Sequence, residues 1–279
     1  MVTVVFGAGG NVGRNIAETL RAQGEKIRFT SRRPGAAGFP PDAEAVAADL
    51  LRPETLPAAL DGARRVFLYA EPGGIDGFVT AARAAGVEHV VLLSSGAVLS
   101  PHPERNPIAR AHLTVESALE KSGLAWTFIR PGGFATNSLW VWQRAVRSGR
   151  PVGLPYPDAL TAPIHEKDLA AIAVTALTEP GHRDRAHTVW GPEALTLRHQ
   201  VELIGEAIGR TIEIEQISPE QARIDMSETM TPEAVTAVLA GWQAGTTAAP
   251  PVSTVVEELT GRPARTFARW AQDHAADFR

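Results

Sequence analysis

A glycine-rich segment near the start of the chain constrains the fold more than any other feature. The apolar run Val2–Phe6 is typical of a buried strand, and it leads directly into Gly7-Ala8-Gly9-Gly10-Asn11-Val12-Gly13. Apolar residues then recur at helical spacing through Asn11–Gln23. A strand, a glycine turn and a helix in this order predict the first βα unit of a doubly wound α/β fold.

The spacing of these glycines predicts a phosphate site. The pattern G-x-G-x-x-G does not fit, because Val12 stands where the third glycine belongs. Gly7, Gly10 and Gly13 fit the pattern G-x-x-G-x-x-G. The first glycine permits a tight turn, the second lets the backbone approach a pyrophosphate, and the third lets the helix pack closely. The helix N-terminus adds free N–H groups and partial positive charge. The alternative is a plain glycine-rich turn. We predict that a dinucleotide binds at Gly7, Gly9, Gly10, Asn11, Val12 and Gly13.

Strand-like and helix-like segments alternate over the first 130 residues. This alternation predicts an α/β fold, a Rossmann-type doubly wound parallel sheet. The expected strands are Val2–Phe6, Lys26–Thr30, Ala45–Ala48, Arg65–Ala70, His89–Ser94 and Ala125–Ile129. The expected helices are Asn11–Gln23, Pro53–Leu60, Ile75–Ala85 and Ile108–Lys121.

The pattern changes after Arg130. Prolines make Arg150–Ala162 mostly loop. We therefore expect an NAD(P)-binding domain over residues 1–132. A smaller C-terminal α/β part, residues 133–279, would bind substrate and be intertwined with the first domain. Its expected helices are Glu166–Leu177, Leu197–Ile208, Pro232–Gln243, Ser253–Leu259 and Arg265–Ala276, and its expected strands are Ala186–Trp190 and Thr211–Gln216.

The end of the second strand indicates which dinucleotide is preferred. NAD(H) sites usually place an acidic residue there for the ribose hydroxyls, but this chain has Ser31-Arg32-Arg33. A guanidinium can hold a 2′-phosphate in a fork, whereas a carboxylate would repel it. We predict NADP(H), with NAD(H) as the other possible cofactor. Ser31 and Arg32 would be the ligands, and Arg33 could help. The alternative is that the arginines are solvated surface charges.

Composition excludes several other classes. The chain has 279 residues, 44% of them hydrophobic, which is enough for a full core. Its net charge is -4 with no basic run, so neither nucleic acid nor an anionic membrane is an expected partner. With no cysteine there can be no disulfide or thiolate chemistry, and no metal site is predicted. Without a signal-like or spanning segment, we expect a cytoplasmic protein whose partner is a small-molecule substrate. Its oligomeric state stays open.

Several segments resemble one protein family when they are taken in order. The chain resembles the NmrA-like branch of the atypical short-chain dehydrogenase/reductase superfamily along nearly its whole length. That branch includes quinone and azo-type NAD(P)H reductases, isoflavone-type reductases and NADP-binding regulators without known turnover. The segments are Gly7–Gly13, Thr30–Arg32, Ala48–Leu50, Val91–Ser95, Glu120–Gly132, Ile164–Ala170 and Leu259–Pro263.

The resemblance also implies contacts to the cofactor. Asp49 and Leu50 would meet the adenine. The fourth strand would pass beside the cofactor, and the sixth would end near the nicotinamide amide. The residues at these two strand ends are Tyr69, Ala70, Glu71, Pro131, Gly132 and Gly133.

The usual catalytic pair of short-chain dehydrogenases is missing. That pair is Tyr-x-x-x-Lys, in which the lysine lowers the pKa of the tyrosine so that the phenol exchanges a proton at neutral pH. The only tyrosines are Tyr69 and Tyr156, and the residues four positions later are Gly73 and Leu160. Any proton donor must therefore come from other residues.

His112, Glu116 and Ser94 are the candidate catalytic residues. His112 and Glu116 are one helical turn apart, so the carboxylate is expected to raise the histidine pKa and make the imidazole a proton donor. The alternatives are a helix-surface ion pair, or a polar pair that orients the cofactor. Ser94 and Ser95 end the fifth strand, where one of them could hydrogen-bond a substrate oxygen or simply cap backbone.

Aromatic residues after the sixth strand suggest a flat conjugated substrate. Phe134, Trp140 and Tyr156 are the substrate candidates, together with His165, although a lone histidine is more often structural. Trp140 and Trp142 cannot share one helix face, so at least one of them is core or surface.

These features together favour an NADP(H)-dependent oxidoreductase. It would transfer hydride to a quinone, enone or similar conjugated small molecule, because such acceptors need little proton assistance. One alternative is a non-catalytic NADP(H)-binding redox sensor or regulator. Another is an isomerase, epimerase or cyclase on the same fold.

Overall fold

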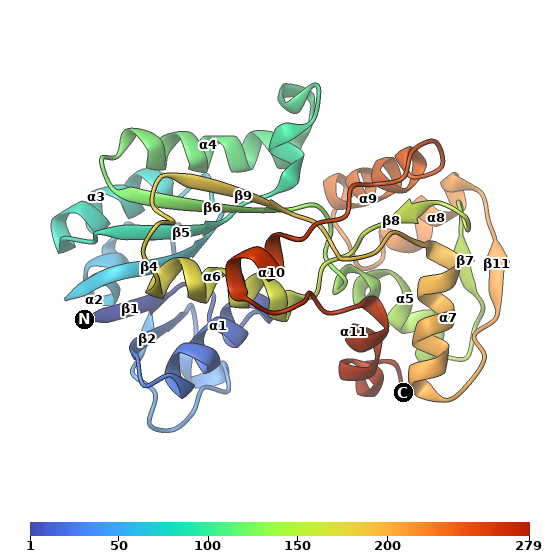
Figure 1. Cartoon of the computed structure of the whole chain (residues 1–279), viewed down its shortest axis with the longest axis horizontal. Coiled ribbons are helices and arrows are strands. Elements are labelled where there is room, and N and C mark those ends of the chain that lie inside the picture. The colour runs from blue at the N-terminus through green and yellow to red at the C-terminus, as the bar shows by residue number, and fades with distance from the viewer. The chain divides into compact units, whose positions relative to one another are not determined.

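The computed structural model describes residues 1–279 and contains a seven-stranded sheet. Its strand order is β3-β2-β1-β4-β5-β6-β9 (Figure 1). The order reverses between β1 and β4, which is the topological switch point where open α/β sheets bind ligands. The strands are β1 (Val2–Val5), β2 (Lys26–Ser31), β3 (Ala45–Ala47), β4 (Ala63–Tyr69), β5 (His89–Leu93), β6 (Ala125–Pro131) and β9 (Arg185–Val189).

The strands of this sheet run parallel, so their carboxyl ends meet at one edge. The pairs β1–β2, β1–β4, β2–β3, β4–β5 and β5–β6 are all parallel. At β6 and β9, backbone bonds join Asp184 N–H to Trp126 C=O and Gly132 N–H to Val189 C=O, so these two strands also start and end together. The predicted α/β fold with a Rossmann-type parallel sheet is confirmed.

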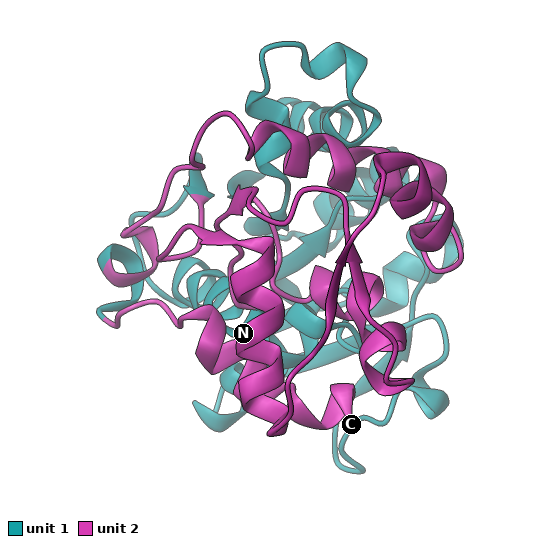
Figure 2. Cartoon of the chain, turned by 90° about the vertical axis from the view of Figure 1, so that its right-hand side faces the viewer, with its two compact units in different colours: residues 1–131, 166–188, 258–261 teal, residues 132–165, 189–257, 262–279 magenta.

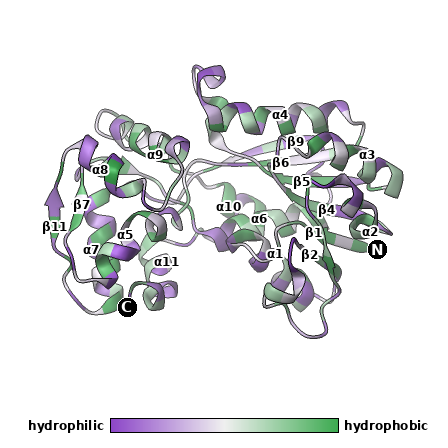
Figure 3. Cartoon of the chain, turned by 180° about the vertical axis from the view of Figure 1, so that it is seen from behind, coloured by the Kyte–Doolittle hydropathy of each residue, from purple (hydrophilic) through white to green (hydrophobic).

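Helices cover both faces of the sheet because its strands are apolar on both sides. Helix α1 packs against α6, and α3 packs against α2 and α4. The core strands are largely hydrophobic in Figure 3. Val4, Phe6, Leu68 and Phe128 are at most 2% exposed. The helices are α1 (Asn11–Ala22), α2 (Leu56–Leu60), α3 (Ile75–Ala85), α4 (Pro107–Lys121) and α6 (Glu166–Thr178).

The chain divides into two compact units (Figure 2). Unit 1 comprises Met1–Pro131, Glu166–Thr188 and Glu258–Gly261, and unit 2 comprises Gly132–His165, Val189–Glu257 and Arg262–Arg279. Unit 2 has its own core, in which Trp142, Leu154, Leu239 and Trp270 are buried. Its elements are α5 (Asn137–Arg147), β7 (Val152–Leu154), β8 (Leu160–Thr161), β10 (Leu195–Thr196), α7 (Leu197–Ile208), β11 (Ile214–Gln216), α8 (Pro219–Met226), α9 (Pro232–Ala244) and α11 (Phe267–Asp273), and α10 (Val255–Thr260) begins in it.

Unit 2 differs from the sequence prediction in several elements. The segment predicted to be mostly loop contains β7 and β8, because each pairs with a strand that is distant in sequence: β11 and β10. The strand expected over Thr211–Gln216 is only Ile214–Gln216. Helices α5 and α8 were not predicted. No helix of the structure has the length and apolar character that crossing a bilayer requires.

Candidate cofactor and active site

The glycine loop between β1 and α1 has the backbone that its sequence predicts. Gly7 adopts φ +68°, a left-handed conformation that favours glycine, and its C=O accepts a bond of 2.9 Å from Gly10 N–H. A Cβ at Gly13 would overlap the Gly7 carbonyl, with the carbonyl carbon only 2.8 Å away. The helix can therefore follow the strand this closely only because position 13 has no side chain.

The N-terminus of α1 is open for an anion. Its N-cap residue is Gly10, which has no side chain to cap the helix, and the first turn carries no acidic residue. Gly9 and Gly10 are both exposed. Arg14 lies beside the loop, with Nη2 3.5 Å from the Gly9 carbonyl oxygen. Free N–H groups, the helix dipole and a nearby guanidinium together favour a bound phosphate.

Charged groups that follow β2, β3 and β4 lie within electrostatic range of Tyr69, the last residue of β4. Burial raises the pKa of Tyr69, the Glu71 carboxylate adds to this rise, Arg32 opposes it, and Asp49 adds a smaller upward effect. The Tyr69 ring also lies against the loop, since a Cβ at Gly7 would be 3.1 Å from Tyr69 Cδ1. The residues that follow β2, β3 and β4 thus lie near Tyr69, next to the phosphate loop.

Arg32 is exposed at the end of β2 and makes no ion pair, in contrast to Arg28, which pairs with Glu44. Ser31 is partly exposed, and its Oγ accepts a bond of 3.2 Å from Arg33 N–H. The Arg32 guanidinium is therefore available to a ligand.

Replacing Arg32 is expected to change cofactor preference. Arg32→Ala should weaken NADP(H) binding roughly 10- to 150-fold, the size of one charge-assisted contact, and should leave NAD(H) nearly unchanged. Calorimetric titration of both cofactors measures this, with Arg33→Ala as the matched comparison. Equal losses for NADP(H) and NAD(H) would contradict a 2′-phosphate contact at Arg32.

A buried hydrogen-bonded group lies at the carboxyl ends of β5 and β6. Ser94 Oγ donates to Glu116 Oε1 at 2.6 Å, and Arg130 donates to both carboxylate oxygens at 2.9 and 2.7 Å. The Glu116 side chain is 3% exposed and that of Arg130 is 18% exposed. Such a two-point contact between a guanidinium and a carboxylate fixes both side chains and leaves Glu116 fully engaged.

The pKa shift expected for His112 is wrong in direction. The Glu116 carboxylate was expected to raise the histidine pKa, but burial lowers the pKa of His112 and outweighs the bond to the Ile108 carbonyl and the pull of Glu116. His112 Nδ1 lies 2.8 Å from the Ile108 carbonyl oxygen. A neutral imidazole that donates from Nδ1 has an unprotonated Nε2, which accepts hydrogen bonds.

The two serines after β5 differ in what they can offer to a ligand. Ser94 is 2% exposed and gives its hydroxyl proton to Glu116. Ser95 is partly exposed, and its Oγ accepts a bond of 3.2 Å from Ala97 N–H, which leaves its own proton for another acceptor. Of the two, Ser95 is better placed to donate to a bound molecule.

The predicted substrate residues are distributed over unit 2. Phe134 is partly exposed and bridges to Ile164. Tyr156 packs against the core of the unit. Trp140 is 53% exposed beside Thr229, whose Oγ1 donates to the Trp140 carbonyl, whereas Trp142 is 2% exposed, so the two indoles lie on different helix faces as expected. His165 is 1% exposed, with Nε2 3.5 Å from Asp273.

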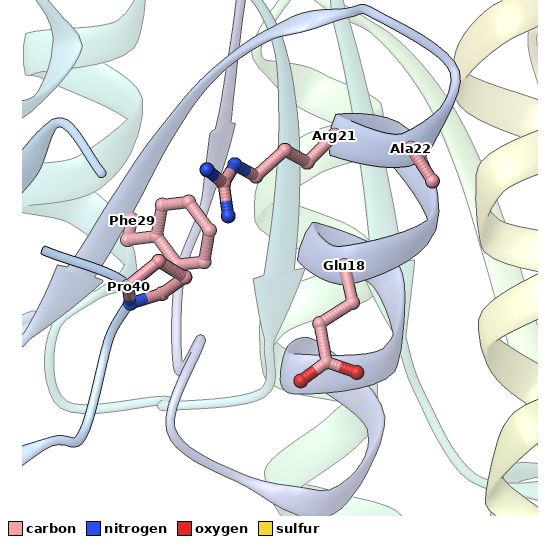
Figure 4. A pocket seen from close by; sticks show the side chains of 5 residues that line it. All are labelled: Glu18, Arg21, Ala22, Phe29 and Pro40. Atoms are coloured by element: carbon pink, nitrogen blue, oxygen red, sulfur yellow. The ribbon is translucent and has the colours of Figure 1, made fainter. Parts of the chain in front are cut away.

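An open cavity of about 410 Å³ lies elsewhere in unit 1. It is formed by the second half of α1 together with Phe29 and Pro40 (Figure 4). Phosphates are held at the N-terminus of a helix, and this cavity is at the other end of α1. It therefore has no part in the phosphate site.

Two residues that the sequence did not single out lie at the carboxyl edge of the sheet. Arg130 binds Glu116, and Trp190 packs against Gly132, where a Cβ would lie 2.6 Å from Trp190 Cδ2. Arg130 stands 14 residues from its partner, and Trp190 is far from Gly132 in sequence. The packing of α4 on β6 brings Glu116 to Arg130, and the pairing of β6 with β9 brings Trp190 to Gly132.

The sheet order, the glycine loop and the open helix N-terminus define a dinucleotide-binding protein of Rossmann type. Comparison with known proteins identifies the family within this class. The family model described as NAD(P)H-binding matches residues 7–180. The chain belongs to this NAD(P)H-binding family, and the predicted membership in the atypical short-chain dehydrogenase/reductases is confirmed.

Two relatives match nearly the whole chain. A (4-alkanoyl-5-oxo-2,5-dihydrofuran-3-yl)methyl phosphate reductase from Streptomyces griseus is 38% identical, over 99% of this chain and 98% of the relative. An NAD(P)H azoreductase from Xenophilus azovorans is 35% identical over the same shares. These relatives and the family model confirm the predicted class, an NAD(P)H-dependent oxidoreductase.

A solved structure shows the same fold. The Citrobacter sp. triphenylmethane reductase complexed with NADP(H) is 22% identical, with a TM-score of 0.80 over 98% of this chain and 99% of that one.

Proposed function

We propose that the chain is an NADPH-dependent reductase of flat, conjugated small molecules, such as quinones and α,β-unsaturated carbonyl compounds. Residues 1–132 would bind the cofactor, and the part from 133 to 279 would bind the acceptor. The reaction adds a hydride from NADPH and a proton from solvent across the conjugated system. The observation that carries this proposal is the geometry at the end of the sheet, where Arg130 and Ser94 occupy the Glu116 carboxylate and the chain has no Tyr-x-x-x-Lys pair.

The nature of the side chains near β5 and β6 supports this choice of acceptor. There is no Tyr-x-x-x-Lys pair, Glu116 is held by Arg130, and burial keeps His112 neutral near pH 7. A plain ketone needs a proton at its oxygen as hydride arrives, whereas a conjugated acceptor spreads the negative charge over several atoms. A site without a strong acid therefore suits conjugated acceptors better.

The names of the two relatives point to the same chemistry. One reduces a dihydrofuran in which the ring C=C is conjugated with an oxo and an alkanoyl group, and the other is an azoreductase. In both cases hydride would enter an unsaturated bond that is part of a conjugated system.

Several side chains have assigned roles in this proposal. The phosphate loop and Arg14 would hold the pyrophosphate, and Ser31 with Arg32 would hold the 2′-phosphate. Tyr69, with the residues that flank it on β4, would border the cofactor. Ser95 would donate a hydrogen bond to the cofactor or the acceptor, and Ser94 would be fixed by Glu116.

The proposal is tested by following NADPH oxidation with a panel of quinones, enones, azo dyes and simple ketones. We expect turnover with the conjugated acceptors and little with the ketones. Turnover confined to ketones would overturn the proposal. Tight NADPH binding without any turnover would instead support a redox sensor, the alternative from the sequence.

His112 is expected to orient ligands rather than supply the proton. His112→Gln, which keeps hydrogen-bonding groups, should retain turnover within about threefold, whereas loss of a general acid would cost about 10²–10⁴-fold. Because the His112 pKa lies below its usual value of about 6.5, the imidazole is neutral above pH 7, and the rate should be flat from about pH 7 to 8.5.

A pH–rate profile of wild type, His112→Gln and His112→Ala tests this role. If protonated His112 were the donor, the wild-type rate would fall as pH rises through the histidine pKa, and both variants would lose that dependence together with most of their activity.

A further inference from the structure

Trp190 stands where the parallel sheet ends. It is the first residue after β9, and Gly132, its neighbour across the sheet, is the first residue after β6. Gly132 N–H donates to the Val189 carbonyl at 2.9 Å, which fixes Trp190 beside Gly132. Ligands of open α/β sheets bind outside the carboxyl ends of the strands.

The Trp190 indole occupies the space that a side chain at position 132 would need. A Cβ on Gly132 would lie 2.6 Å from Trp190 Cδ2 and would overlap two further ring carbons. At Gly133 the corresponding space is empty. Trp190 is partly exposed and Gly132 is exposed, so an aromatic residue and bare backbone are both accessible at this place.

The backbone that carries Trp190 is held on its other side as well. Gly191 N–H donates to the Ala162 carbonyl at 3.0 Å, and a Cβ on Gly191 would lie 2.8 Å from the Pro163 carbonyl carbon. Ser253 N–H donates to the Gly191 carbonyl at 3.3 Å. Because backbone bonds hold the chain on both sides of residue 190 and the ring packs on Gly132, the indole is positioned before any ligand arrives, which lowers the entropic cost of binding.

We propose that Trp190 is the residue that selects flat acceptors, by stacking its indole on the conjugated ring of the substrate. The inference rests on the proposed reductase function and names the substrate contact within it. Two of the three aromatic residues predicted from sequence fit this role less well, since Tyr156 packs against the core of unit 2 and Trp140 lies beside Thr229. An electron-rich indole suits an electron-poor ring such as a quinone.

Steady-state kinetics with a two-ring naphthoquinone and a small acyclic enone test this contact. Trp190→Leu should raise KM for the naphthoquinone roughly three- to tenfold and change KM for the enone little, because only the former presents a face to stack. Trp190→Phe should recover most of the loss. Gly132→Ala should resemble Trp190→Leu, since its Cβ displaces the ring. Trp126→Leu is the matched control, because this partly exposed tryptophan lies at the opposite, amino-terminal end of β6, and it should keep the wild-type KM values.

Binding measurements separate the possible outcomes. NADPH affinity by calorimetry should stay within about twofold of wild type in Trp190→Leu, and the variant should bind naphthoquinone more weakly in the NADP⁺ complex. Equal kinetics for the leucine variants at 190 and 126, or an equally weakened NADPH affinity, would overturn the role of Trp190. If wild type binds NADPH but reduces no acceptor, the proposed function fails together with this inference.

Discussion

Gly10→Val is expected to remove NADPH binding from a folded protein. Gly10 is exposed, and its φ of -85° suits any residue. A Cβ there would lie 3.3 Å from the Gly7 carbonyl oxygen, which is tight without overlapping it. The valine side chain would therefore be tolerated by the fold but would cover the N–H groups of the α1 N-terminus. We expect affinity to fall at least about 100-fold, or about 2.7 kcal/mol.

Calorimetry with NADPH and thermal unfolding of the same sample measure binding and stability separately. Gly241→Ala is the control for a glycine substitution in open space. It should leave NADPH affinity unchanged and should not lower stability, because alanine favours the helix α9 in which it lies. Gly13→Ala should differ from Gly10→Val by lowering stability, because its Cβ overlaps the Gly7 carbonyl. Unchanged NADPH affinity in folded Gly10→Val would show that the pyrophosphate binds elsewhere.

The first half of the fold could be predicted because its signals are local. Each βα unit carries its own apolar periodicity, and the glycine loop needs only Gly7, Gly10 and Gly13 in one short stretch. Unit 2 has weaker signals. The strand Val152–Leu154 forms only because Ile214–Gln216 pairs with it, and no local pattern reports a partner 62 residues away.

The candidate site shows the same limit at the level of side chains. An i, i+4 spacing correctly places His112 and Glu116 on one helix face, but it gives neither burial nor competing partners. The packing of α4 on β6 brings Arg130 beside Glu116, and the guanidinium then binds both carboxylate oxygens. The direction of the His112 pKa shift follows from burial, which only the assembled fold determines.

Breaking the Glu116–Arg130 pair is expected to destabilise the fold strongly. Arg130→Met leaves the Glu116 carboxylate buried with Ser94 as its remaining hydrogen-bond donor, and Glu116→Leu leaves the guanidinium without its carboxylate. Removing one partner of a buried ion pair costs about 3–5 kcal/mol, because an uncompensated charge stays in a poorly solvated place. Urea denaturation of each variant measures the free energy of unfolding.

The double variant, Glu116→Leu with Arg130→Met, separates an unpaired charge from lost packing. Replacing both partners by apolar side chains of similar size is often nearly neutral, so we expect the double variant to be more stable than either single one. Since Ser94 loses its acceptor in the double variant, its hydroxyl becomes free, and turnover should change even where stability recovers. A double variant whose loss equals the sum of the two single losses would show that Glu116 and Arg130 act independently, and that their ion pair does not hold the end of the sheet together.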